Sequence, residues 1–348
     1  MSEKVKTYIY PHPFHLESGE ILPYLTIAYH TYGTLNEKKD NCIWVCHALT
    51  ANSDVADWWP HTVVKDGFLD PAKYFVVCAN ILGSCYGTTG PLSENPTTGE
   101  PWFDRFPKVT IRDMIRAHKL LAEHLQIKKI FSLIGSSVGG FQAVEWAVSE
   151  PELFESVILI ATAEKATPWT IAIDETQRMA IFADSSYGEP RQDAARAGLA
   201  AARAIGLLTY RGGEGYNLTQ QTMHDGESIP DNHRACSYQR YQGEKLVNRF
   251  DAYSYVNILN SFDTHDIGRC RGGVERALAR LKMPVLVIGI TTDMLFPPEE
   301  MKALSSKIEN SRYMEIESSF GHDGFLVEHG LLNSIIKNFY KEITQWQK

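Results

Sequence analysis

A serine flanked by glycines stands where a strand pattern changes into a helix pattern. Residues 135–139 read GSSVG and match G-x-S-x-G, a motif that places its serine at the apex of a sharp strand-to-helix turn. Only Ser137 has glycine two positions away on both sides, because the same count from Ser136 meets Ile134 and Val138. The turn needs these glycines because its backbone segments approach too closely for a Cβ atom. We therefore predict that Ser137 is a nucleophile at a helix N-terminus.

Such a serine needs an acid and a histidine later in the chain, in that order. Asp293 ends the strand-like run 284–293, and His322 lies in a loop after the next strand-like run, 312–319. Both positions follow carboxyl ends of predicted strands, where open α/β sheets place their sites. We predict that His322 takes the proton from Ser137, and that Asp293 orients the imidazole and stabilises its charged form.

Other interpretations of these two residues stay open at this point. Asp293 could be a turn or helix-capping residue, and His322 could be a solvated loop histidine, one of 12 in the chain. Glu299 and Glu300 compete for the role of the acid, although both fall inside the following helical segment.

Acyl transfer also requires hydrogen-bond donors for the negative oxygen of the tetrahedral intermediate. One donor is expected from the backbone N–H of Val138, the residue after the nucleophile. The other is expected from the loop after an early strand, which is the segment 46–52 here, and the N–H of Leu49 is our candidate. The alternative is that His47 and its neighbours only shape a turn.

These residues require a sheet to position them, and the first half of the chain predicts one. Apolar runs alternate with helical patterns, which favours a mostly parallel sheet with helices on both faces. Thr110 is expected to cap the amphipathic helix 110–127, with Asp113 in its first turn. The predicted strands are 24–33, 41–49, 73–82, 129–135 and 156–163.

The pattern changes after about residue 166, since the next hundred residues read as helices without a strong strand. Strand patterns return near residue 284, and a helical segment over roughly 325–347 closes the chain. The simplest division is an α/β core in two parts, 1–166 and 281–348, interrupted by an all-helical lid insertion, 167–280.

Composition narrows the function classes. The 348 residues are 44% hydrophobic and 22% charged, with a net charge of -8, and they contain no Lys/Arg block of the nucleic-acid-binding type. No run approaches the 18 apolar residues of a membrane span, and no long apolar stretch marks a signal peptide. The six cysteines include no C-x-x-C pair. We expect a cytoplasmic protein without a metal, a nucleic-acid partner or a membrane contact.

Longer motifs also keep a recognisable order. Through them the sequence resembles the homoserine O-acyltransferase family of the α/β-hydrolase superfamily, within it the homoserine O-acetyltransferases of methionine biosynthesis. The motifs are HALT (47–50), NILGSCYGTTGP (80–91), NPTTGEPW (95–102), FPKVTIRDMIRAHKLL (106–121), GSSVGGFQAVEWA (135–147), RYQGEKLVNRFDAYSY (240–255), TTDMLFPPEE (291–300) and GHDGFL (321–326).

The resemblance implies an α/β-hydrolase fold with Ser137, Asp293 and His322 as its triad. It implies a ping-pong reaction in which acetyl-CoA, a co-substrate and not a resident cofactor, acylates the serine before the hydroxyl of L-homoserine takes the acetyl group. It also implies that Arg203, with Tyr210 two turns on, and Asp323 hold the acceptor, and that the lid helices form a homodimer contact. A guanidinium suits a carboxylate, and a carboxylate suits an ammonium.

Departures from the family pattern leave the substrates open. The family's elbow usually reads G-G-S-M-G-G, whereas Ser136 and Val138 make this one G-S-S-V-G-G. A succinyl donor or a serine acceptor therefore stays possible, as does an esterase that uses water, or a non-catalytic protein of the same fold. The aromatic residues of the insertion could line a tunnel or fill its core; these are Tyr238, Tyr241, Tyr253 and Tyr255.

Overall fold

An eight-stranded sheet runs through the molecule in the order β1-β4-β6-β5-β9-β10-β11-β12. The computed structural model describes residues 4–221 and 233–346. The first three strands of this order pair antiparallel, and the remaining pairs are parallel. The strands are β1 (Lys6–Tyr10), β4 (Leu25–Tyr32), β5 (Cys42–Cys46), β6 (Phe75–Ala79), β9 (Ile130–Ser136), β10 (Val157–Ile160), β11 (Val285–Ile290) and β12 (Ser311–Ile316).

The mostly parallel sheet predicted from the apolar runs is confirmed. Every residue of β5, β6, β10 and β11 is buried, as expected for strands covered on both faces. The edge strand β1 was not predicted, and it is mostly exposed. Two short hairpins lie outside this sheet: β2 (Phe14–His15) with β3 (Ile21–Leu22), and β7 (Glu94–Asn95) with β8 (Glu100–Pro101).

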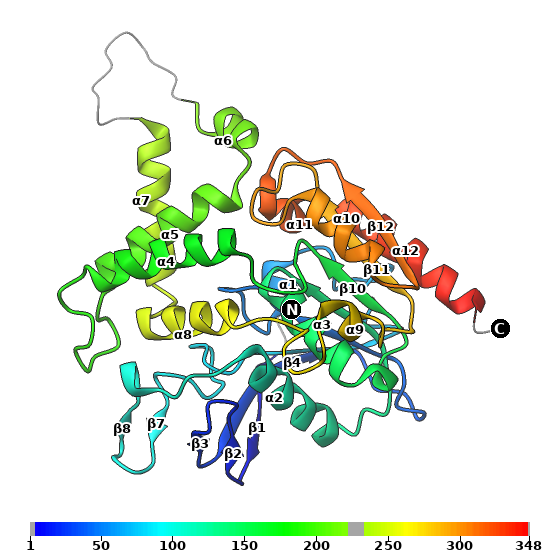
Figure 1. The fold of residues 1–348 in the computed structure, drawn as a ribbon, viewed down its shortest axis with the longest axis horizontal. Helices are drawn as coiled ribbons and strands as arrows, with labels where there is room; N and C mark the ends of the chain where they lie inside the picture. The colour runs from blue at the N-terminus through cyan, green and yellow to red at the C-terminus, as the bar shows by residue number, and fades with distance from the viewer. Residues whose placement is uncertain (1–3, 222–232, 347–348) are drawn as a thin grey trace.

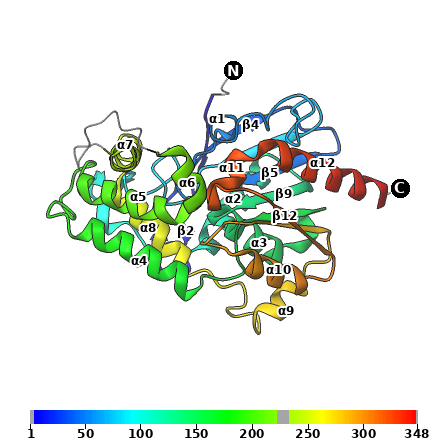
Figure 2. The same ribbon diagram turned by 90° about the horizontal axis from the view of Figure 1, so that it is seen from above.

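Helices cover the two faces of the sheet, and each side has its own apolar core. Figure 2 shows α3, α9 and α10 on one side and α1 and α12 on the other. The expected cap of α2 is confirmed, because the Asp113 N–H donates to Thr110 Oγ1 and the Thr110 N–H donates to Asp113 Oδ2. The helices are α1 (Val55–Trp58), α2 (Ile111–His124), α3 (Val138–Ser149), α9 (Val274–Leu278), α10 (Pro298–Ser306), α11 (Gly324–Val327) and α12 (His329–Trp346).

Between β10 and β11 the chain forms a separate group of helices, α4–α8, which we call the lid. Figure 1 shows them beside the sheet, with α4, α5 and α8 packed on one another. In the described parts of 167–280, the strand-like pairing is limited to one isolated β-bridge, between Asp266 and Lys165, as expected for an insertion without a strong strand. Residues 222–232 of the predicted insertion lie outside the described residues. The lid helices are α4 (Pro168–Phe182), α5 (Arg196–Tyr210), α6 (Gly213–Thr219), α7 (Arg234–Val247) and α8 (Ala252–Asp263).

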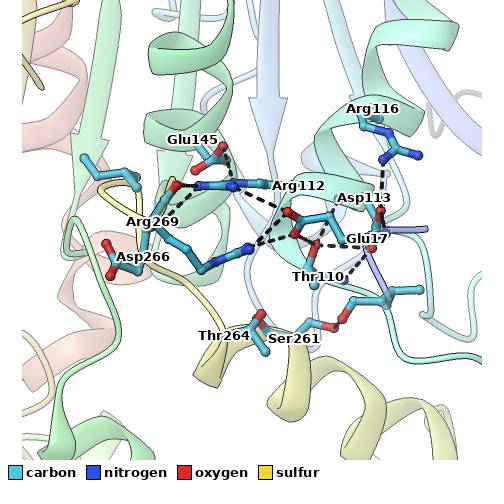
Figure 3. Close-up of polar contacts among 12 residues, drawn as sticks. Glu17, Thr110, Arg112, Asp113, Arg116, Glu145, Ser261, Thr264, Asp266 and Arg269 are labelled. Carbon is cyan, nitrogen blue, oxygen red and sulfur yellow. Dashed lines mark hydrogen bonds and ion pairs between the residues drawn. The ribbon is translucent and has the colours of Figure 1, made fainter. Parts of the chain in front are cut away.

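After α8 the chain returns to the core through a network of ion pairs. Figure 3 shows Arg112 of α2 between Glu17 and Glu145. Its Nη1 lies 3.4 Å from Glu17 Oε1, and its Nε lies 3.1 Å from Glu145 Oε1. Arg269 of the returning segment pairs with Glu17 at 2.8 Å, and its carbonyl accepts from Arg112. Arg271 pairs with the buried Glu145. The boundary at residue 280 stays a prediction, although these contacts join the segment after α8 to α2 and α3.

The cysteines take no part in a disulfide. All six are free, and Cys42, Cys46 and Cys78 lie buried in β5 and β6, where burial raises the pKa of their thiols. They act as small apolar residues of the core. Over residues 4–221 and 233–346, no helix has the length and apolar character needed to cross a membrane.

Candidate active site

The predicted serine elbow is present between β9 and α3. Ser137 has φ +55° and ψ -127°, a left-handed backbone that non-glycine residues adopt rarely. A Cβ on Gly135 would lie 2.1 Å from the Gly139 carbonyl oxygen, and a Cβ on Gly139 would lie 2.0 Å from the Cys46 carbonyl oxygen. Larger residues cannot fit at either position, so both motif glycines are required by the close approach of the backbone.

The end of the neighbouring strand β10 holds the elbow in this conformation. The Ser137 N–H donates to the carbonyl oxygens of Ile160 and Ala161 at 3.0 and 3.1 Å. The Ser137 carbonyl accepts from Thr162 Oγ1 at 2.9 Å. A strained backbone of this kind costs on the order of 1–3 kcal/mol and persists only where its surroundings fix it. The sheet therefore presents the serine in one orientation.

The predicted acid and base contact each other. Asp293 Oδ2 lies 2.8 Å from His322 Nδ1, and both residues are buried. Asp293 Oδ1 accepts from the N–H groups of Leu295 and Phe296 at 2.8 and 3.0 Å, which fixes the carboxylate. Burial alone would lower the pKa of His322, but the adjacent Asp293 carboxylate outweighs it and raises that pKa above 6.5. The imidazole is thus oriented and made more basic.

Side chains at the end of β11 tether the loop that carries the histidine. Thr292 Oγ1 donates to the Ser318 carbonyl at 2.7 Å and accepts from the Gly321 N–H at 2.9 Å. The rings of Phe296 and Phe325 each have their centroids 5.4 Å from that of His322. Hydrogen bonds and packing therefore restrict the imidazole on several sides.

A cavity of about 470 Å³ brings the predicted residues together. Asp293 alone among them does not line it, because it lies behind His322. No hydrogen bond joins Ser137 Oγ to His322 within the described chain, and such contacts in substrate-free enzymes often tighten only with substrate bound. The predicted residues that line the cavity are Leu49, Ser137, Val138, Arg203, Tyr210, His322 and Asp323.

His47 fixes the loop that carries the second predicted donor. Its Nε2 accepts from the Ile81 N–H at 3.2 Å, so Nδ1 carries the proton that bonds the Ala48 carbonyl at 2.9 Å. Burial lowers the pKa of His47 to about 4, so the ring is neutral. His47 therefore helps to shape this turn, and Leu49 lines the cavity. The role of the Leu49 N–H stays a prediction.

The lid forms the opposite wall of the cavity. Arg203 and Tyr210 share one face of α5, with the guanidinium carbon 5.5 Å from the centroid of the Tyr210 ring. In the described parts of the chain Arg203 has no carboxylate partner, so its charge is available to an anion in the cavity. Asp323 instead forms an ion pair with Arg211, whose Nε lies 2.9 Å from Asp323 Oδ2.

The comparisons with known proteins agree with this geometry. A family model described as the alpha/beta hydrolase fold matches residues 42–329. The homoserine O-acetyltransferase of Cyclobacterium marinum is 47% identical over 328 residues, which cover 94% of this chain and 92% of that one. That of Moorella thermoacetica is 42% identical and covers 94% of both chains. The chain belongs to the homoserine O-acetyltransferase family. It is therefore a transferase.

Solved structures place this member of the homoserine O-acetyltransferase family beside enzymes with different names. The homoserine O-acetyltransferase of Bacillus anthracis superposes with a TM-score of 0.88 at 25% identity, covering 97% of both chains. The esterase E22 also superposes with a TM-score of 0.88 at 25% identity, covering 97% of this chain and 100% of that one. The fold is therefore shared between homoserine O-acetyltransferases and an esterase, and the fold alone does not choose the acyl acceptor.

Four charged residues that line the cavity of this homoserine O-acetyltransferase family member were not predicted from the sequence: Asp57, Asp174, Lys245 and Arg249. Asp174 of α4 is buried, and burial, together with the nearby Asp263, raises its pKa well above the usual value. Lys245 in α7 and Arg249 just after it are exposed and line the cavity, and Asp57 of α1 also lines it. No spacing pattern marks these residues, because they meet only when the lid packs on the core.

The four tyrosines whose role the sequence left open are absent from the lining of this cavity. Tyr253 and Tyr255 are both buried in α8: Tyr253 packs against Phe103 of the core, and Tyr255 donates to Gln177 of α4. Tyr241 is 59% exposed. Tyr238 packs against Tyr216 of α6.

Proposed function

We propose that the protein transfers an acetyl group from acetyl-CoA to the hydroxyl of L-homoserine through an acetyl-Ser137 intermediate. One observation carries the proposal. A single cavity combines a serine and a histidine on its core side with the free Arg203 cation of the lid and the Asp323 carboxylate beside the histidine. An esterase would need only the first two of these groups.

In the first half-reaction His322 Nε2 removes the proton from Ser137 as the serine oxygen attacks the thioester carbonyl. The N–H groups of Leu49 and Val138 stabilise the negative oxygen of the tetrahedral intermediate. The carbon–sulfur bond then breaks, and the thiol of CoA leaves with the proton that His322 returns. The serine is left as an acetyl ester.

In the second half-reaction His322 takes the proton of the homoserine hydroxyl, and that oxygen attacks the ester carbonyl. The bond to Ser137 breaks, the serine recovers a proton from His322, and O-acetyl-homoserine leaves. Arg203 binds the carboxylate of the acceptor and Asp323 its ammonium, which directs the hydroxyl towards the ester. Water lacks both charged groups and gains nothing from these contacts.

The cations at the cavity support a phosphorylated donor. Lys245 and Arg249 stand about one helical turn apart in sequence and are exposed at the cavity, where the phosphates of acetyl-CoA would be attracted. Cytoplasmic location, a role in methionine biosynthesis and homodimer formation through the lid helices are parts of the same proposal, and family membership supports them.

The test is to measure kcat/KM for acetyl-CoA and for succinyl-CoA, each with homoserine and with serine. The proposal expects the pair of acetyl-CoA and homoserine to give the highest value, with parallel lines in double-reciprocal plots, the signature of a ping-pong mechanism. Preference for succinyl-CoA or serine would reassign the substrates. Release of CoA at one rate with or without any amino acid would contradict the transferase reaction and favour hydrolysis.

A further inference from the structure

The corner between α5 and α6 lies directly against the loop that carries His322. The Gly215 N–H donates to the Ser319 carbonyl at 3.1 Å. Arg211, the first residue after α5, forms its ion pair with Asp323, the first residue after the histidine. A lid segment and the loop that carries His322 are therefore joined next to the proposed base.

Two glycines make this approach close. A Cβ on Gly321 would lie 2.4 Å from the Gly212 nitrogen, and a Cβ on Gly212 would lie 2.3 Å from the Ser319 carbonyl oxygen. Gly321 also has φ +64°, in the left-handed region that glycine adopts without strain. Because neither glycine has room for a Cβ, the two backbone segments pack at a fixed short distance. This distance sets where Arg211 meets Asp323.

The charges around Asp323 give Arg211 a specific part. Burial raises the pKa of Asp323, and the cations that oppose this rise are Arg211, Arg203 and His322, whereas Asp293 adds to it. Arg211 is the cation in direct contact, and its side chain is 27% exposed against 14% for that of Asp323. A largely buried carboxylate that loses its partner becomes protonated more readily and then binds an ammonium poorly.

We infer that Arg211 is a positioning residue for the acyl acceptor, which acts through Asp323. It holds the Asp323 carboxylate ionised, and it leaves the second carboxylate oxygen for the ammonium of an amino acid. Because α5 also carries Arg203, the same corner sets the distance between the cation for the acceptor's carboxylate and the anion for its ammonium. This inference rests on the proposed function, since it concerns the second half-reaction of the same site.

The two half-reactions separate this role from a structural one. Acetylation of Ser137 by acetyl-CoA needs no acceptor, so it does not depend on Arg211. We expect Arg211→Leu to release the first equivalent of CoA at the wild-type rate while the KM for homoserine rises by about tenfold or more. The rise becomes larger as the pH falls, because Asp323 is then protonated more readily. Arg211→Lys keeps the cation and recovers part of the loss.

Arg196→Leu is the matched control, because this arginine at the start of α5 bonds the Val247 carbonyl, Asn248 and Glu244 inside the lid, away from Asp323. It should change neither the first release of CoA nor the KM for homoserine. An unchanged or lowered KM in Arg211→Leu would overturn the inference, as would a slowed first release of CoA with the KM unchanged.

Binding provides a readout that survives failure of catalysis. Calorimetry with Ser137→Ala should show a Kd for L-homoserine that rises by about tenfold when Arg211→Leu is added. Equal Kd values in the two proteins would overturn the inference. If instead the wild type binds homoserine but releases no CoA from acetyl-CoA, the proposed function fails on its donor, and the Kd comparison still decides the role of Arg211.

Discussion

The two walls of the cavity are built in different ways. On the core wall, backbone hydrogen bonds and strand ends fix the groups: β10 holds the elbow of Ser137, and the turn after β11 holds Asp293 against His322. On the lid wall, side chains fix each other, as in the contact of Arg203 with Tyr210. We propose that the core wall is preorganised for acyl chemistry in general, and that Arg203 of the lid wall, together with Asp323 beside the histidine, selects what receives the acyl group.

Replacing Ser137 should abolish both half-reactions of the proposed acetyl transfer. We expect Ser137→Ala to lower kcat for acetyl transfer by at least about 10⁴-fold, because neither half-reaction can proceed without the serine oxygen. The neighbouring Ser136→Ala is the control and should keep most of the activity. Stopped-flow measurement of CoA release checks both variants. Full activity in Ser137→Ala with loss in Ser136→Ala would move the nucleophile by one residue and refute the proposed elbow chemistry.

Removing the free cation of the lid wall should affect only the acceptor. We expect Arg203→Ala to lower kcat/KM for homoserine by about 10²-fold, because a bidentate, charge-assisted contact to the carboxylate is lost. The rate of Ser137 acetylation should stay within about twofold of wild type, since that step contains no acceptor. Single-turnover and steady-state assays compare the two values. An equal fall in both would show that Arg203 serves the core chemistry and would remove the distinction between the walls.

The acid limb of the pH profile should report the core wall. His322 acts as a base only when neutral, and its pKa is raised by Asp293, so activity should fall with decreasing pH through a value above 6.5. Below that value the rate should drop about tenfold for each pH unit. Asp293→Asn removes the negative charge that raises the pKa of His322, while the burial that lowers this pKa remains. The acid limb of the pH profile should therefore move to lower pH, and the residual rate should be small. An unmoved limb would assign it to another group.

The ion pairs of the returning segment should matter for stability alone. Arg112→Leu leaves the buried Glu145 with Arg271 and Ser149 as its remaining partners, and we expect it to lower the free energy of unfolding by about 1–3 kcal/mol. Arg312→Leu removes an exposed pair with Glu342 and should cost less than about 1 kcal/mol. Urea titrations measure both, and kcat/KM should stay unchanged in each. A large change in kcat/KM for Arg112→Leu would link this network to the site.

The contrast between the walls also explains what could be predicted from the sequence. Ser137, Asp293 and His322 follow strand ends, and the apolar runs that mark those strands are local. The glycines of the elbow were predicted for the reason that the structure gives, a close approach of backbone segments. The exposed edge strand β1 escaped prediction because it lacks a continuous apolar run.

The lid wall depends on contacts between segments far apart in sequence. Nothing near Arg211 indicates that it meets Asp323, which is 112 positions later. The position of Asp174 in the cavity could not be predicted either. A carboxylate on a helix usually faces solvent, and the burial of Asp174 follows only from the packing of the lid. Arg203 and Asp323 were expected through the family resemblance, since their local sequence does not distinguish them from ordinary surface residues.

Intact-mass measurement tests the central claim most directly. The protein is mixed with acetyl-CoA alone, weighed, and weighed again after homoserine or buffer is added. The account predicts one acetyl group per chain, located on the peptide of Ser137, which persists in buffer and disappears when homoserine is added. Absence of the acetyl group, or its loss to water as fast as to homoserine, would contradict a core wall that forms the ester and a lid wall that chooses its acceptor.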